Sequence, residues 1–137
     1  MEHSLHHKIK VERAMAPITT TSATTSNGVI VDTAGHESCE FVVLTGTVAA
    51  SAAATFTIQE SDASNLAGAT TVSAEETLGS ITLTATSDDG EFRMGSIGKK
   101  RYQRISMITT HAASTEIEGA VCILGHPKNA PVAEQSG

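Results

Sequence analysis

The residues of this chain best suited to bind a metal are its six histidines. Three of them, His3, His6 and His7, lie within the first seven residues. Zinc needs three or four convergent ligands, whereas neighbours such as His6 and His7 point to opposite faces of an extended chain. The other three histidines stand alone in predicted turns, at His36, His111 and His126. We therefore expect no metal site and no cofactor.

The two cysteines, Cys39 and Cys122, each lie inside an apolar run. This setting favours a buried, inert thiol, and whether the two pair in a disulfide stays open. The chain has no Gly-x-Ser-x-Gly motif, and residues 95–99 lack the spacing of a phosphate-binding loop. Residues 88–91 match a fragment of a calcium loop without its ligand spacing. The sequence thus predicts a protein that is not an enzyme.

Positive charge is concentrated in one short segment, at Lys99, Lys100, Arg101 and Arg104. Lys8, Lys10 and Arg13 add a second basic stretch. Such clusters serve as a phosphate-binding patch, as a patch complementary to an acidic protein surface, or as ordinary solvated charge. The net charge of -6 argues against a general affinity for nucleic acid or for an anionic membrane.

Length and composition indicate one small domain. The chain has 137 residues, which is enough for a single core. Aromatic residues make up only 3%, and tryptophan is absent, which disfavours pockets for sugars, bases or drug-like ligands. No apolar stretch reaches the length of a membrane-spanning helix, and residues 1–13 lack the apolar core of a secretory signal. We expect synthesis in a cytoplasm, without export by the secretory route.

Short alternating runs rich in Thr, Val and Ile predict an all-β protein. The predicted strands cover residues 9–13, 29–31, 39–47, 55–59, 78–86, 91–97, 102–109 and 116–124. The strand 39–47 is apolar enough to be buried on both faces, and in the last strand Ile117, Val121 and Ile123 should share one face. Asn27-Gly28 predicts a turn and Asp89-Gly90 a hairpin. About eight strands and no convincing amphipathic helix favour an antiparallel, jelly-roll-like β-sandwich.

The predicted organisation has three parts: residues 1–13 as an amino-terminal arm or first strand, residues 14–125 as the sandwich, and residues 126–137 as a carboxy-terminal tail. Ordering extended ends costs conformational entropy. The two ends are therefore expected to become ordered along neighbouring subunits, through strand addition or similar contacts.

Three blocks of sequence carry a family resemblance: residues 6–14 with Ala16-Pro17, residues 97–104, and residues 121–133. They resemble a group of small prophage-encoded virion proteins. That group is similar in size and β-content to the jelly-roll decoration (cement) proteins of tailed-phage capsids. The resemblance implies a homodimer or higher homo-oligomer on the outside of the capsid, bridging subunits of the major capsid protein.

The three blocks are where contacts with the capsid are expected. The candidate interface residues are His6, Lys8, Lys10, Arg13, Lys99, Lys100, Arg101, Arg104, His126, Pro127, Lys128 and Pro131. Three alternatives remain: another virion component such as a neck, tail-tube or fibre-associated domain, a carbohydrate- or cell-binding sandwich, and a small enzyme. We do not expect the protein to bind nucleic acid or a membrane.

Overall fold

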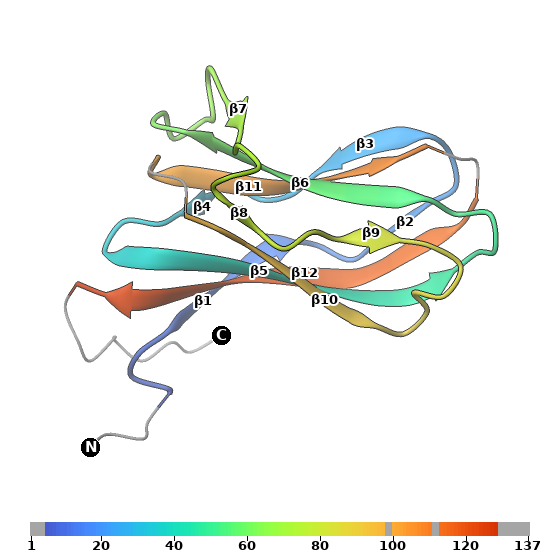
Figure 1. Cartoon of the computed structure of the whole chain (residues 1–137), viewed down its shortest axis with the longest axis horizontal. Helices are drawn as coiled ribbons and strands as arrows, with labels where there is room; N and C mark the ends of the chain where they lie inside the picture. Colours follow the sequence, from blue (N-terminus) through green and yellow to red (C-terminus); the bar gives the residue numbers. More distant parts are fainter. Residues whose placement is uncertain (1–4, 98–99, 111–112, 129–137) are drawn as a thin grey trace.

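The computed structural model describes residues 5–97, 100–110 and 113–128, and within them the fold is two antiparallel β-sheets packed face to face (Figure 1). The first sheet has the order β1-β12-β5-β10-β8, and β2 also pairs with β12. Its strands are β1 (Lys10–Met15), β2 (Ile18–Thr20), β5 (His36–Val48), β8 (Thr77–Leu78), β10 (Glu91–Ser96) and β12 (Thr115–Pro127).

The second sheet has the order β3-β11-β6-β7, with β4 also on β11 and β9 also on β6. Its strands are β3 (Thr24–Asn27), β4 (Val31–Asp32), β6 (Ala54–Ser61), β7 (Thr70–Thr71), β9 (Thr82–Leu83) and β11 (Tyr102–Thr109). The predicted all-β, antiparallel sandwich is confirmed. The described residues form twelve strands instead of the predicted eight or so, partly because the run 78–86 is divided between β8 and β9, which lie in different sheets.

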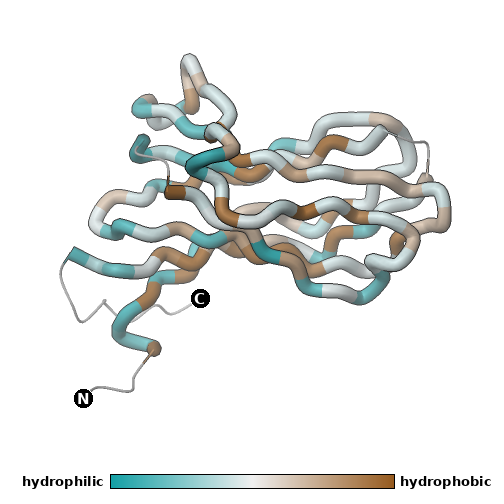
Figure 2. Tube along the Cα trace, viewed as in Figure 1, coloured by the Kyte–Doolittle hydropathy of each residue, from teal (hydrophilic) through white to brown (hydrophobic). Residues whose placement is uncertain are grey.

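The core lies between the two sheets and is built from alternate residues of the long strands. Phe41, Ile58, Leu83, Ile105 and Leu124 are each at most 1% exposed. Figure 2 shows apolar segments along the strands in both layers. Burial of this kind contributes ~1.5–3 kcal/mol for a large aliphatic side chain, and it comes from positions that strict alternation predicts. The described residues contain no helix long and apolar enough to cross a bilayer.

Two predictions about strand faces are wrong. Strand β5 is not buried on both faces, because its residues alternate and Leu44 is 48% exposed. In β12, Ile117 is buried but Val121 is 36% exposed. The register shifts between Ile117 and Gly119, where Gly119 has a φ of 144°. This bulge, which glycine tolerates, turns the next residues over, so that Ala120, Cys122 and Leu124 face the core.

The predicted hairpin at Asp89-Gly90 does not form. Strand β9 pairs with β6, and β10 pairs with β5, so the turn carries the chain from one sheet to the other. Its residues instead brace β5: the Asp89 amide donates to Gly46 O at 2.9 Å, and Asp88 Oδ1 accepts from the Val48 amide at 2.6 Å.

Asn27-Gly28 does not reverse the chain either. Strands β3 and β4 pair with successive parts of β11. The chain therefore keeps its direction through Asn27-Gly28 and runs along β11 on both sides of it. Gly28 donates its amide to Ile105 O at 2.8 Å. A Cβ on Gly28 would collide with the carbonyl oxygens of Ala14 and Ile105. Gly28 therefore allows β1 and β11 to approach each other closely, and this approach closes one side of the sandwich.

The first described residues are less extended than predicted. Residues 6–8 form a turn, closed by a hydrogen bond from the Lys8 amide to Leu5 O. The rings of His6 and His7 meet edge to face at 5.2 Å instead of pointing apart. Strand β1 crosses the predicted boundary at residue 13, and β12 runs to Pro127, two residues into the predicted tail. His3, Lys99, His111 and Pro131 lie outside the described residues.

Candidate interaction site at the basic end of the sandwich

One end of the sandwich joins the parts of the three sequence blocks that the structure describes. Lys10, at the start of β1, pairs with Leu124, near the end of β12. The Lys128 amide donates to Gly35 O at 2.8 Å, just before β5. The Thr33 amide donates to Arg101 O at 2.9 Å, just before β11. Segments from both termini and from the middle of the chain thus meet at this end, on the left of Figure 1.

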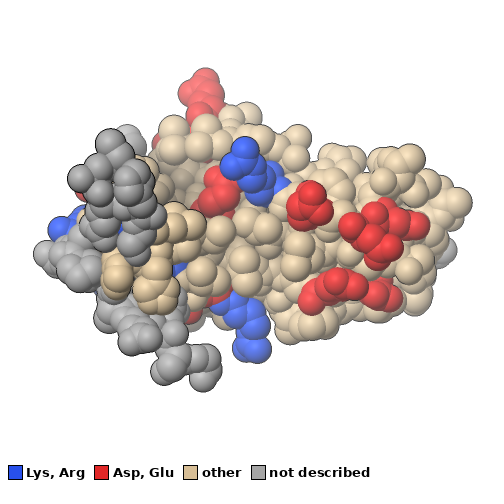
Figure 3. All heavy atoms as spheres, turned by 90° about the horizontal axis from the view of Figure 1, so that it is seen from below, with Lys and Arg blue, Asp and Glu red and all other residues tan. Residues whose placement is uncertain are grey.

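We call this region the basic end. It carries Lys8, Lys10, Lys100, Arg101 and Lys128. The opposite end is acidic: the carboxylate of Glu116 lies over Gly46, and Asp88 bonds to Val48. Figure 3 shows acidic side chains gathered at the end opposite the termini. The lysines among the described residues thus lie at one end of the molecule, where Glu12 pairs with Lys10, Asp32 pairs with Arg101 and Glu37 lines the hollow described below, while carboxylates gather at the other end.

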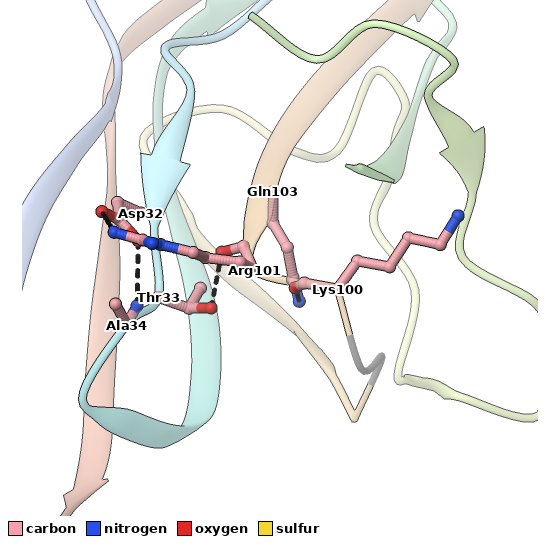
Figure 4. Close-up of polar contacts among 6 residues, drawn as sticks. All are labelled: Asp32, Thr33, Ala34, Lys100, Arg101 and Gln103. Atoms are coloured by element: carbon pink, nitrogen blue, oxygen red, sulfur yellow. Dashed lines mark hydrogen bonds and ion pairs between the residues drawn. The ribbon is translucent and has the colours of Figure 1, made fainter. Parts of the chain in front are cut away.

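Arg101 is held by an internal partner. Its Nε donates to Asp32 Oδ1 and its Nη2 to Asp32 Oδ2, both at 2.8 Å (Figure 4). The hydrogen bonds from Arg101 keep the pKa of the Asp32 carboxyl below its usual value, and Asp32 raises the pKa of Arg101. Bidentate geometry of this kind orients both groups. Arg101 therefore acts first as a clamp between β4 and β11, and only second as surface charge.

Arg104 and Arg13 do not join the basic end. Arg104 lies on the outer face of the second sheet, where its Nε and Nη2 donate to Gln59 Oε1 at 3.0 and 2.7 Å. Arg13 lies opposite Val121 on the first sheet. Lys100 lies next to Arg101 but is not held by Asp32. Its ammonium group points away from the Asp32–Arg101 pair (Figure 4).

A hollow of about 320 Å³ opens between the sheets at the basic end. Its lining is mostly polar and consists of Thr33, His36, Glu37, Ser38, Cys39, Ser96, Ile97, Lys100, Gln103 and Lys128. Gln103 is 2% exposed, and its Oε1 has no hydrogen-bond partner. Both ring nitrogens of His36 are also buried without a partner. An unpartnered buried polar group costs ~1–3 kcal/mol, so this hollow is the least satisfied part of the described interior.

Burial of His36 and Gln103, the two residues of this hollow with unpartnered polar atoms, was not predicted from the sequence. His36 was predicted to be an exposed turn residue, but it begins β5 and pairs with Pro127. Gln103 was not singled out at all. A signal for Gln103 was present, since it occupies the inward position of the alternating series that continues with Ile105 and Met107. A polar residue at an inward position needs an explanation.

The two cysteines meet behind this hollow. Cys39 Sγ and Cys122 Sγ lie 2.9 Å apart, and both residues are buried free thiols. The hydrogen bond with Cys122, together with burial, raises the pKa of the Cys39 thiol. Both cysteines are therefore in the setting of core thiols, as predicted, and the raised pKa of Cys39 disfavours the thiolate that nucleophilic chemistry requires there.

A second hollow, of about 410 Å³, lies beside the first on the same end. It is lined by Lys8, Ile9, Ser38, Gly125, His126 and Pro127. Ser38 Oγ and His126 Nδ1 lie 2.7 Å apart. A serine–histidine contact is one half of a nucleophile–base pair, but within the described residues no carboxylate orients His126. The structure thus brings three of the predicted interface residues together here without completing a catalytic triad.

The described residues contain no group of three or more His, Cys, Asp and Glu side chains that could hold a metal ion. No family model matches the chain, and no curated protein matches it significantly. The basic end thus combines lysine side chains with a polar hollow in which polar atoms of His36 and Gln103 are buried without a hydrogen-bond partner.

Proposed function

We propose that this protein is a structural virion protein that binds the outside of a tailed-phage capsid and stabilises it by bridging major capsid protein subunits. The observation that carries the proposal is the convergence of the three blocks on one end of a rigid sandwich. Residues 6–14, 97–104 and 121–133 gave the resemblance. Among their described parts, Lys10 pairs with Leu124, and Lys100 and Lys128 line the same hollow.

The work of such a protein is mechanical. Each bound copy buries surface on two capsid subunits and so raises the free energy needed to separate them. A standard protein interface buries ~1,600 Å² in total. A weak contact suffices when a homo-oligomer attaches at more than one point, because the second attachment occurs at a high effective concentration. In this proposal the protein is no enzyme and needs no cofactor, nucleic acid or membrane.

The charge distribution supports a preferred orientation on the particle. Lysines at one end and carboxylates gathered at the other give the molecule a charge asymmetry, which orients it in the field of a charged surface before contact. The basic end offers Lys100 and Lys128 at the rim of the hollow. We therefore place an acidic surface of the major capsid protein against this end.

Copy number on the particle tests the role. Purified tailed-phage particles from cells that carry this chain would be analysed by quantitative mass spectrometry against the major capsid protein. Hundreds of copies per particle support a capsid decoration protein. Six or twelve copies would indicate a neck or tail component, and absence from the particle would overturn both.

Charge reversal at the rim tests the orientation. Lys100→Glu with Lys128→Glu should weaken attachment to the particle, and more strongly at low salt than at high salt, because exposed charges are screened. Arg104→Glu, on the outer face of the second sheet, is the matched control and should bind normally. Equal binding by the Lys100/Lys128 double variant and the wild type would remove the basic end from the interface.

A further inference from the structure

The interior of the sandwich becomes polar at the basic end. Alternation places every second side chain of β5, β6, β10 and β11 between the two sheets, and along most of each strand these side chains form the apolar core. Toward the basic end the same inward positions are occupied by Glu37, Glu60, Ser96 and Gln103. Three of them, Glu37, Ser96 and Gln103, line the hollow of about 320 Å³, which we call the polar hollow. Both sheets therefore contribute polar side chains where the core ends.

Gln103 gives the polar hollow an acceptor that has no donor. The residue is 2% exposed, and its Oε1 has no hydrogen-bond partner within the described part of the chain. Its Nε2 donates to Lys100 O at 3.4 Å (Figure 4), which is longer than the usual ~2.7–3.2 Å. The amide is therefore held weakly and can turn toward a molecule in the hollow. An unsatisfied buried polar group in a folded protein indicates a partner that is still to be supplied.

The polar hollow carries charge of both signs. Glu37 is exposed at its rim, and Glu60, which is 7% exposed, pairs with Gln103 on the neighbouring strand. Lys100 and Lys128 supply positive charge to the lining. A ligand with only negative charge would face the Glu37 carboxylate, and one with only positive charge would face the two lysines. A ligand that carries both charges is complementary to the whole lining.

The size and composition of the polar hollow restrict the ligand further. Its volume lies near the lower limit of the ~300–1,000 Å³ that is typical of ligand pockets. Among the described residues that line it, none is Phe, Tyr or Trp, so no ring of these types is available for stacking on a nucleobase or a sugar. The ligand is therefore small and is held by hydrogen bonds and charge.

We propose that the polar hollow binds a free α-amino acid. The ammonium group, which has three donors, points inward and donates to Gln103 Oε1 and to the Glu37 carboxylate. The carboxylate lies toward the rim, where Lys100 and Lys128 hold it through charge-assisted hydrogen bonds. A buried glutamine without a donor thus becomes satisfied when the ligand enters. The inference does not depend on attachment to a capsid, because the site is complete in one copy of the chain.

Calorimetric titration of the purified full chain with each of the common amino acids tests the ligand class. At least one should bind one-to-one with a Kd of about 1 mM or below. Its methyl ester, which lacks the carboxylate, and its N-acetyl derivative, which lacks the ammonium group, should each bind about tenfold more weakly or worse. No binding by any amino acid up to about 10 mM would overturn the inference. Equal binding of the ester or of the N-acetyl derivative would overturn it as well.

A substitution of Gln103 tests the site. Gln103→Leu keeps a similar size and removes the acceptor, so the Kd should rise about tenfold or more. The free energy of unfolding in urea should not fall, because Oε1 has no partner to lose. A merely structural glutamine would give the opposite result, a less stable protein with unchanged affinity, and that result would contradict the inference. Gln59→Leu, on the outer face of the same sheet, is the matched control and should bind the amino acid normally.

A second variant keeps the test decisive if Gln103→Leu does not fold. Lys128 is exposed, so Lys128→Gln should leave the circular dichroism spectrum unchanged. The variant should bind the amino acid a few-fold more weakly, because one cation beside the carboxylate is lost. An unchanged Kd would remove Lys128 from the site and overturn the proposed orientation. All these measurements use the isolated chain, so they succeed or fail independently of the attachment of the protein to particles.

Discussion

Arg101 holds Asp32 through two parallel hydrogen bonds of 2.8 Å and so joins β4 to the start of β11 across 69 positions of sequence. The pKa of Asp32 is lowered by this contact, so the ionised carboxylate favours the folded state. That contribution is present above the unfolded pKa, near 3.8, and is lost as the pH falls through the lower folded pKa.

Replacement of Asp32 should therefore have a pH-dependent effect on stability. Asp32→Asn should lower the melting temperature at pH 7, and the difference from the wild type should shrink as the pH falls below 3.8. Thermal denaturation at pH 7, 4 and 2.5 measures it. Glu12→Gln, which breaks the single contact of 2.8 Å between Lys10 and Glu12, is the control and should have a smaller effect. An equal loss at all three pH values would contradict the role of the ionised carboxylate.

Thr45 should be sensitive to loss of its hydroxyl. It is 2% exposed, its Oγ1 donates to Ser87 O at 2.6 Å, and the Gly90 amide donates back to it at 2.9 Å. Thr45→Val keeps the shape but leaves both backbone groups unpaired, so unfolding free energy should fall by about 1–3 kcal/mol. Thr47→Val, at an exposed position of the same strand, should stay within ~0.5 kcal/mol. Urea denaturation compares the two variants. Equal losses of unfolding free energy would argue against a stabilising role for the hydrogen bonds of the Thr45 hydroxyl.

Gly28 should not tolerate a methyl group. A Cβ would collide with the backbone carbonyls of Ala14 and Ile105, which have no freedom to move aside. Gly28→Ala should therefore cost about 1–3 kcal/mol of unfolding free energy. Gly46→Ala is the matched control, because the group in its way is the flexible end of Glu116, and it should cost less. The reverse order in urea denaturation would contradict the close approach of β1 and β11.

Both cysteines should resist modification in the folded protein. Cys39 and Cys122 are buried, and the pKa of Cys39 is raised, so little thiolate is available. A thiol-specific chromogenic reagent should react slowly in native buffer and should titrate two thiols in denaturant without reductant. Rapid reaction of the native protein would show that the thiols are accessible. Absence of free thiol in denaturant would show that they form a disulfide.

Local patterns in the sequence were enough to predict the strands and much of the core. Phe56, Ile58, Ile105 and Met107 occupy alternate positions of β6 and β11, within the predicted strands 55–59 and 102–109, and all four are buried. The reason is that alternation of side chains is a property of each strand by itself. The same reasoning failed in β12, because a bulge at Gly119 reverses the alternation. A glycine inside a strand is a local signal for such a bulge, and strict alternation ignores it.

The pairing of strands and the partner of each charge were decided only by the tertiary structure. Asp89-Gly90 has the composition of a hairpin turn, yet β10 pairs with β5, whose residues lie about 50 positions earlier in the chain. Arg101 looked like free surface charge until the fold placed Asp32 beside it. Hydrophobic periodicity fixes which side of a strand faces inward, but long-range pairing depends on how all strands share one core, and only the assembled sandwich determines that.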